Sequence, residues 1–142
     1  MGSLEFHVDS AEFRNKLETK INEIPGRTIN LIDDISDVVE AYMRDESPVR
    51  FGDLQNSHTT EVLSDLERWI GPTVKHAEYV VKGTRPHLIE GNPFLYWKGA
   101  EHPVRQVQHP GTQANDYITR AKDRSEGRSS QLIQEFLGWL TE

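Results

Sequence analysis

Residues 76–89 read HAEYVVKGTRPHLI, and the chain changes character across this stretch, from helical spacing to short extended segments. Residues 74–82 are expected to form a short helix. Gly83 can end it, because glycine readily takes the positive φ that follows many helices. Arg85 precedes Pro86, and the residue before a proline is held out of the helical region. The chain is therefore expected to run extended from this point.

The middle of the chain is rich in residues that interrupt helices. Five of the seven prolines lie between Pro72 and Pro110, and glycines are interleaved with them. Such punctuation is typical of short strands joined by turns. The candidate strands cover residues 58–64, 67–70, 87–90 and 93–97.

The N-terminal third has the apolar spacing of helices. Residues 4–8 alternate apolar and polar side chains, which predicts a short strand, and Asp9 with Glu12 resembles a capping box at a helix start. Apolar residues then recur at helical spacing as far as Pro25, and again over residues 28–45. They form either a tight helical hairpin or one helix kinked at Pro25, because a proline inside a helix removes one hydrogen bond.

The C-terminal part is predicted to be helical again. Residues 114–124 suit one helix, and Ser129 or Ser130 can cap a last helix with its apolar residues on one face. The order of helices, strands and helices predicts an α+β fold in which helices pack on a small antiparallel sheet. The chain is expected to form one domain, residues 1–142, made of an N-terminal strand and helices (1–46), a strand-and-turn core (47–112) and C-terminal helices (113–142).

The composition excludes several classes of protein. The 142 residues include 23 acidic and 16 basic side chains, a net charge of -7, and no cysteine. Disulfides, thiolate zinc sites and cysteine nucleophiles are therefore excluded, and an acidic chain is a poor nucleic-acid coat. No apolar run approaches the ~20 residues that span a membrane, so we expect a cytoplasmically made protein with no membrane partner. The acidity is concentrated in residues 1–46, which hold 11 acids and 5 bases.

Motifs for enzymatic chemistry are absent from the sequence. There is no phosphate-binding loop and no Gly-x-Ser-x-Gly nucleophile elbow, so neither an enzymatic activity nor a cofactor is predicted. His87, His102 and His109 lie in the strand-and-turn region, and neutral imidazole is a common zinc ligand. Their spacing matches no metal motif, and a small metal-dependent hydrolase is kept as the alternative of another class.

An aromatic cluster admits two interpretations. Tyr79, Tyr96 and Trp97 could stack on bases, as aromatic residues do in single-strand-binding proteins. The local charge is close to neutral, so the electrostatic part of such a site is missing. A core or interface position is favoured instead, and Phe94, Tyr96 and one face of Trp97 are expected to fill the core.

Four short motifs follow one another along the middle of the chain. They are GDLQNS at residues 52–57, GTRPH at 83–87, WKG at 97–99 and HPGT at 109–112. In this order, over roughly residues 47–125, they resemble the neck and tail-completion family of long-tailed bacteriophages, to which the minor tail protein Z of lambda-like phages is related. Arg50 and Phe51 stand where that family usually has Asp-Thr before the glycine.

The resemblance implies a structural virion protein at the head–tail junction, without enzymatic activity, that works as a homo-oligomeric ring, by family analogy a hexamer. Its implied partners are further copies of itself, other head–tail connector and tail proteins, and genomic DNA that passes through the lumen without specific binding. It would be assembled in the host cytoplasm and located in the virion. A tail terminator, the ring that caps the tail tube, is the alternative within the same class.

The motif residues admit two roles, because they can define turns of the fold or form a contact surface. Arg85 carries a rigid fork of donors that can bind a neighbouring carboxylate, so the acidic residues 1–46 and the Arg85 loop could be complementary patches in a head-to-tail ring. The candidate motif or interface residues are Gly52, Leu54, Ser57, Tyr79, Gly83, Thr84, Arg85, Pro86, His87, Trp97, His109, Pro110 and Gly111.

Overall fold

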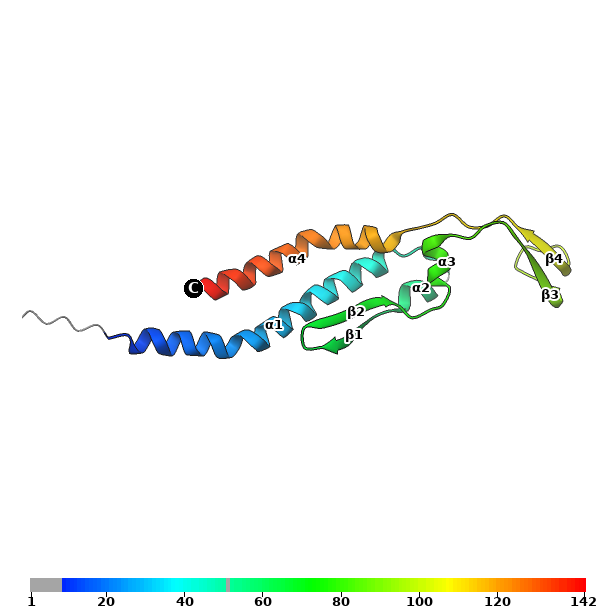
Figure 1. The fold of residues 1–142 in the computed structure, drawn as a ribbon. Coiled ribbons are helices and arrows are strands. Elements are labelled where there is room, and N and C mark those ends of the chain that lie inside the picture. The colour runs from blue at the N-terminus through cyan, green and yellow to red at the C-terminus, as the bar shows by residue number, and fades with distance from the viewer. Residues whose placement is uncertain (1–8, 51) are drawn as a thin grey trace, which may run out of the picture.

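The computed structural model describes residues 9–50 and 52–142, which form an elongated α+β molecule (Figure 1). In chain order its elements are α1 (Ala11–Glu46), α2 (Asp53–Asn56), β1 (His58–Ser64), β2 (Glu67–Pro72), α3 (Ala77–Lys82), β3 (His87–Leu95), β4 (Val104–His109) and α4 (Tyr117–Thr141). The two long helices pack against each other in opposite directions, while β3 and β4 project at the far end of the molecule. The predicted α+β class is confirmed.

The N-terminal region forms one helix and not a helical hairpin. Pro25 lies inside α1, which continues through it to Glu46. The helix begins at Ala11, with Ser10 at the N-cap, which is one residue later than a cap at Asp9 would place its start. The Asp9 carboxylate nevertheless accepts a hydrogen bond from the Ala11 amide at 2.9 Å. The strand predicted over residues 4–8 lies outside the described residues.

The β1–β2 hairpin lies along α1. Its strands pair antiparallel, with His58 opposite Pro72. The Arg68 guanidinium binds the Asp33 carboxylate of α1 at 2.7 Å, and that basic side chain is almost fully buried. A salt bridge and packing against a helix therefore support this hairpin. Its first strand spans residues 58–64 as predicted, and its second runs two residues beyond the predicted 67–70.

The strands form two separate two-stranded sheets rather than one. Residues 87–90 and 93–97 were expected as two strands, but one strand, β3, runs from His87 to Leu95 with an irregularity after Glu90. Its partner β4 was not predicted. The two valines of β4, Val104 and Val107, are three residues apart, so this segment lacks the strict alternation that marks a half-buried strand.

The C-terminal region is also one helix, where two were expected. The Asp116 carboxylate begins α4 by accepting hydrogen bonds from the hydroxyl and the amide of Thr119, at 2.7 and 3.2 Å, and these bonds lower the pKa of Asp116. Near the expected break, the Ser125 hydroxyl donates to the Lys122 carbonyl within the helix at 2.7 Å. A Cβ at Gly127 would meet nothing within 4 Å, and α4 continues through this glycine.

The buried core is small and lies where α2, α3 and the start of α4 meet. Leu54, Ala77 and Tyr117 form it, and Tyr117 is 0 % exposed. The expectation that Phe94, Tyr96 and Trp97 fill the core is wrong, since these side chains are 54 %, 69 % and 48 % exposed. They belong to the projecting hairpin and its turn, which no helix covers in Figure 1. Among the described residues, no helix is long and apolar enough to cross a membrane.

Candidate functional site

Two of the sequence motifs meet at the base of the β3–β4 hairpin. Thr84 and Thr112 exchange a pair of backbone hydrogen bonds, at 2.9 and 3.0 Å. Next to this bridge, His87 pairs with His109, and their rings lie 5.1 Å apart. The GTRPH and HPGT motifs are therefore the two strands of one junction between the helical body and the hairpin. We call residues 87–109, which comprise β3, β4 and the turn between them, the arm.

Glycine is required on both sides of this junction. Gly83 has φ of 71° and Gly111 has φ of 87°, so the positive φ predicted at Gly83 is confirmed. A Cβ at Gly83 would lie 2.5 Å from the Thr112 carbonyl oxygen, and one at Gly111 would clash with the Thr84 carbonyl oxygen. These glycines let the two backbones approach closely, which is a role in the fold.

The other junction candidates lie on the surface or shape the turn. Arg85, Pro86 and Pro110 are exposed, and Arg85 has no ion pair among the described residues. His87 Nδ1 lies 2.8 Å from the Arg85 carbonyl oxygen, and His109 Nδ1 accepts a hydrogen bond from the Gly111 amide at 3.0 Å. Both rings are thus held by neighbouring backbone groups.

The metal-site hypothesis can be compared with this geometry. The rings of His87 and His109 are adjacent, whereas His102 lies before β4, at the opposite end of that strand from His109. Residues 9–50 and 52–142 contain no group of three or more His, Asp or Glu side chains that could hold a metal ion. No observation in this part of the chain favours the hydrolase alternative.

The upstream motif builds the turn around α2. Gly52 precedes this helix with φ of 83°, Leu54 is buried in the core, and the Ser57 hydroxyl donates to the Leu54 carbonyl at 2.7 Å. Phe51, one of the two residues that depart from the family pattern, lies outside the described residues. Two other candidates, Tyr79 and Trp97, are exposed.

A buried polar cluster was missed by the sequence analysis. His58, 2 % exposed, lies with Nδ1 3.2 Å from the Gln55 carbonyl oxygen and Nε2 3.0 Å from the Tyr117 hydroxyl. Because a carbonyl only accepts, Nδ1 carries the hydrogen and Nε2 accepts from the tyrosine. The Ser47 hydroxyl lies 3.4 Å from the same Nε2. Burial raises the pKa of Tyr117, so its hydroxyl stays protonated and remains a donor.

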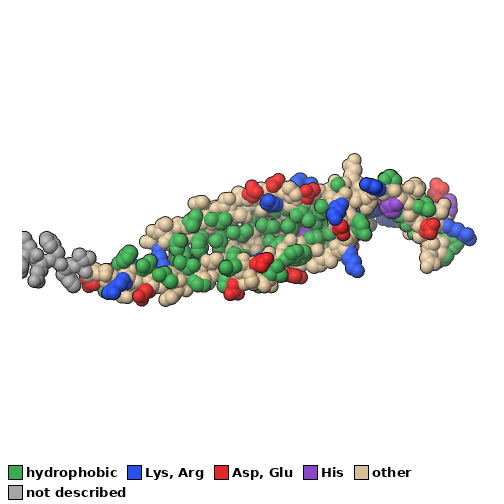
Figure 2. All heavy atoms as spheres, viewed as in Figure 1, with side chains coloured by type: hydrophobic (Ala, Val, Ile, Leu, Met, Phe, Trp, Pro, Cys, Tyr) green, Lys and Arg blue, Asp and Glu red, His purple; other side chains and the backbone are tan. Residues whose placement is uncertain are grey.

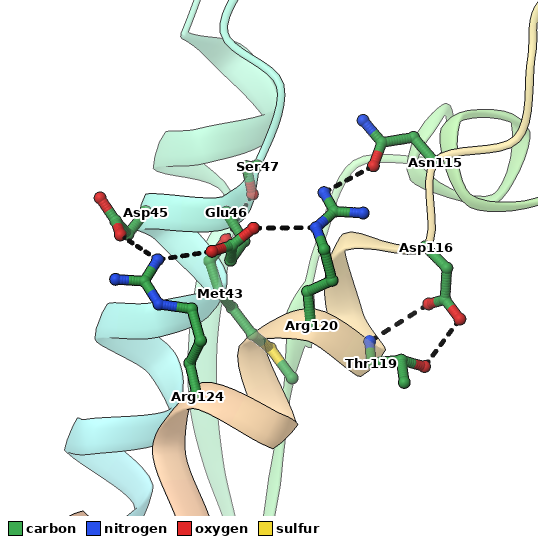
Figure 3. Close-up of polar contacts among 9 residues, drawn as sticks. All are labelled: Met43, Asp45, Glu46, Ser47, Asn115, Asp116, Thr119, Arg120 and Arg124. Atoms are coloured by element: carbon green, nitrogen blue, oxygen red, sulfur yellow. Dashed lines mark hydrogen bonds and ion pairs between the residues drawn. The ribbon is translucent and has the colours of Figure 1, made fainter.

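An ion-pair network joins the end of α1 to the start of α4 (Figure 3). The Arg124 guanidinium binds the carboxylates of Asp45, at 2.6 Å, and of Glu46. Arg120 binds Glu46 at 2.9 Å and the Asn115 side-chain oxygen at 2.8 Å. These arginines, Arg124 first, hold the pKa of Glu46 below its ordinary value. Part of the N-terminal acidity therefore pairs with the chain's own C-terminal helix.

Replacing Glu46 with glutamine is expected to reduce stability at neutral pH, because two arginines lose their shared carboxylate. The folded-state pKa of Glu46 lies below the ordinary value of 4.5, so its contribution is present above that pH and is lost as the pH falls through the lower value. The difference in urea midpoint between wild type and variant should therefore shrink below pH 4.5. Circular dichroism over a pH series measures it.

Glu18→Gln is the control for this charge change, since Glu18 is exposed on α1 and has no ion pair among the described residues. It should leave the urea midpoint nearly unchanged at every pH. A Glu46→Gln effect that stayed constant through the acid range would contradict the assigned role of the carboxylate.

Large apolar side chains are exposed on several surfaces, which include the β1–β2 hairpin, with Val62, Leu63 and Leu66, and the two surfaces described next. Figure 2 shows hydrophobic side chains gathered along the line between α1 and α4. A groove of about 760 Å³ lies between the start of α1 and the end of α4, and Phe13, Leu17, Trp139 and Leu140 supply its apolar lining; we call it the terminal groove. The second surface is the arm, whose exposed apolar residues are Leu88, Phe94, Tyr96 and Trp97.

Comparison with known proteins adds no relative to this description. No family model, curated protein or solved structure matches the chain. What the chain does is therefore inferred from its own surfaces and from the order of its motifs.

Proposed function

We propose that this chain is a structural subunit of the head–tail junction of a tailed virus, where a homo-oligomeric ring of copies completes the neck and joins tail to head. The resemblance of the motif series at residues 52–57, 83–87, 97–99 and 109–112 to the neck and tail-completion family supports the viral part of the proposal. The exposed surface of the single chain supports the oligomeric part.

The single chain exposes far more surface than a compact monomer of its mass. Its accessible area is 11209 Å² for 16.3 kDa, whereas a compact protein of this size exposes roughly 7,500 Å². A standard interface covers about 800 Å² on each partner, so the surplus of roughly 3,700 Å² accommodates the two neighbours that each ring subunit has. This surplus area carries the oligomeric part of the proposal, and the order of the four motifs carries the viral part.

The charge distribution fits a subunit beside a DNA path. Asp34 and Asp37 are exposed on α1 and have no ion pair among the described residues. Such carboxylates repel the phosphate backbone, so DNA would pass a surface of this kind without binding to it. This placement is part of the proposal, and the virion at the head–tail interface is its proposed location.

Electron microscopy and gene context test the proposal. The purified full-length chain should form rings of uniform diameter, sixfold by analogy with the family, and its gene should lie near portal, capsid and tape-measure genes. Loss of the gene should yield separate heads and tails of normal length. Tails of uncontrolled length would instead favour the tail terminator, because a terminator sets where the tube ends. A monomeric protein encoded far from such genes would contradict both.

A further inference from the structure

The polar cluster around His58 lies where four elements of the body meet. His58 begins β1, Gln55 belongs to α2, Ser47 is the C-cap of α1 and Tyr117 begins α4. His58 and Tyr117 are both buried, and their rings meet edge to face with centroids 5.5 Å apart. Segments that are distant in the sequence are therefore joined through this one imidazole.

The hydrogen bonds of the cluster are those of a neutral ring. Nδ1 of His58 donates to the Gln55 carbonyl oxygen, and Nε2 accepts from the Tyr117 hydroxyl. Burial raises the pKa of Tyr117, so this hydroxyl keeps its proton. A proton added to Nε2 would place two donors against each other, and the tyrosine hydrogen would have to turn away.

The hydrogen bonds can be rearranged, but the added charge cannot be compensated. Ser47 donates its own hydrogen to the Met43 carbonyl at 2.6 Å, so its oxygen could accept the tyrosine hydrogen. No carboxylate within residues 9–50 and 52–142 makes a hydrogen bond or ion pair with the His58 ring. The Arg44 guanidinium donates to the His58 carbonyl oxygen at 2.9 Å, so the charged group that does contact this residue is a cation.

The acidic groups on the surrounding elements have other partners or are exposed. On α1, arginines bind two carboxylates, those of Glu40 and Glu46 (Figure 3). On α3 and α4, the carboxylates bind Lys82 and Thr119, and the acidic side chain of α2 is exposed; these three residues are Glu78, Asp116 and Asp53. From β2, the residue opposite His58 is the uncharged Pro72. A charged ring would therefore be buried without a counterion.

A buried charge without a counterion is strongly destabilising, so the folded body needs the neutral ring. Histidine is the side chain that changes charge between about pH 5 and pH 8, and a histidine that is neutral and buried must gain its proton in acid. Over this range the unfolded chain would bind more protons than the folded chain. Stability should therefore decrease as the pH falls, because protons favour the state that binds more of them.

We propose that His58 is an acid-sensitive switch, which holds α1, α2, β1 and α4 together while its ring is neutral and loosens their contact when the ring gains a proton. The inference stands on the geometry of this cluster and does not depend on the proposed ring of subunits. Its pH range differs from that of the ion-pair network. The pKa of Glu46 lies below 4.5, so that carboxylate keeps its charge where histidines gain theirs.

The pH dependence of stability tests this switch. Urea unfolding of the full chain, followed by circular dichroism, compares wild type with His58→Gln, because glutamine carries a donor and an acceptor but gains no proton. From about pH 7.5 to about pH 5.5, the unfolding equilibrium constant should rise about 5- to 10-fold more in wild type, as for one proton taken up near pH 6.5 in the unfolded chain. His102→Gln, which changes an exposed histidine of the arm, is the control and should keep the wild-type dependence.

A measurement on wild type alone covers the case in which His58→Gln does not fold. Nuclear magnetic resonance of the ring nitrogens distinguishes a neutral histidine from a charged one and shows which nitrogen carries the hydrogen. At about pH 6 the native His58 ring should be mainly neutral with its hydrogen on Nδ1, whereas the exposed ring of His102 should be mainly charged.

Equal pH dependence in wild type and His58→Gln would overturn the switch. A native His58 ring that gains its proton together with that of His102 would overturn it as well. Either result would leave the proposed function standing, since electron microscopy and gene context test that function separately.

Discussion

Replacing Tyr117 with alanine is expected to lower the free energy of unfolding by about 3–5 kcal/mol, the range for losing a buried aromatic side chain. Tyr117 is 0 % exposed and packs with Leu54 and Ala77 in the small core. Its hydroxyl also donates to the buried His58 ring, which would lose a partner. Since small domains are stable by only about 5–15 kcal/mol, much of the helical body should unfold under mild denaturation.

Urea denaturation followed by circular dichroism measures this loss, and two further variants resolve its origin. Tyr117→Phe keeps the ring and removes the hydrogen bond, so its cost should be about 1–3 kcal/mol. Tyr96→Ala removes the same side chain from a position that is 69 % exposed, and a surface change should cost within about 0.5 kcal/mol. Equal costs for Tyr117→Ala and Tyr96→Ala would show that the core does not lie where the structure places it.

The predictions that depend on local chemistry are the ones that the structure confirms. The Gly and Pro punctuation of the middle of the chain predicted short strands, and β1 spans the predicted residues 58–64; the positive φ at Gly83 followed from the ability of glycine to adopt it. The junction residues 83–87 and 109–112 were also singled out, as two of the four motifs that resemble the neck and tail-completion family. Their pairing with each other was not predicted, since a contact between distant segments leaves no mark on either one.

Features that depend on tertiary contacts were missed or, as with the single helix through Pro25, left as one of two alternatives. Pro25 and Gly127 both disfavour a helix locally, at a cost of about 3 and 1 kcal/mol respectively, yet each lies inside a long helix, because α1 and α4 pack against each other. His58 carried no local signal at all, since its main partner Tyr117 lies 59 residues away. The arm was mistaken for core, because its aromatic residues have the composition of a buried strand.

Replacing Gly111 with alanine is expected to open the base of the arm, at a cost of about 2–5 kcal/mol. The left-handed backbone costs a residue with a Cβ about 1–2 kcal/mol, and each of the two hydrogen bonds between Thr84 and Thr112 is worth about 0.5–1.5 kcal/mol. The added Cβ would clash with the Thr84 carbonyl oxygen and lie 3.0 Å from the Pro86 nitrogen. Both neighbours are backbone atoms, so relief requires the two strands to separate.

Gly99→Ala separates the cost of the backbone conformation from the cost of the close approach. Gly99 has φ of 98°, comparable to that of Gly111, but a Cβ there would meet nothing within 4 Å. Amide hydrogen exchange should show that Gly111→Ala abolishes protection at Thr84 and Thr112, whereas Gly99→Ala leaves it in place. Protection in α1 and α4 should persist in both variants, because the atoms nearest to a Cβ at Gly111 belong to Thr84, Arg85 and Pro86 and not to these helices. If the two variants behaved alike, backbone strain alone would explain the effect, and the close pairing of the two motifs would not be what holds the arm.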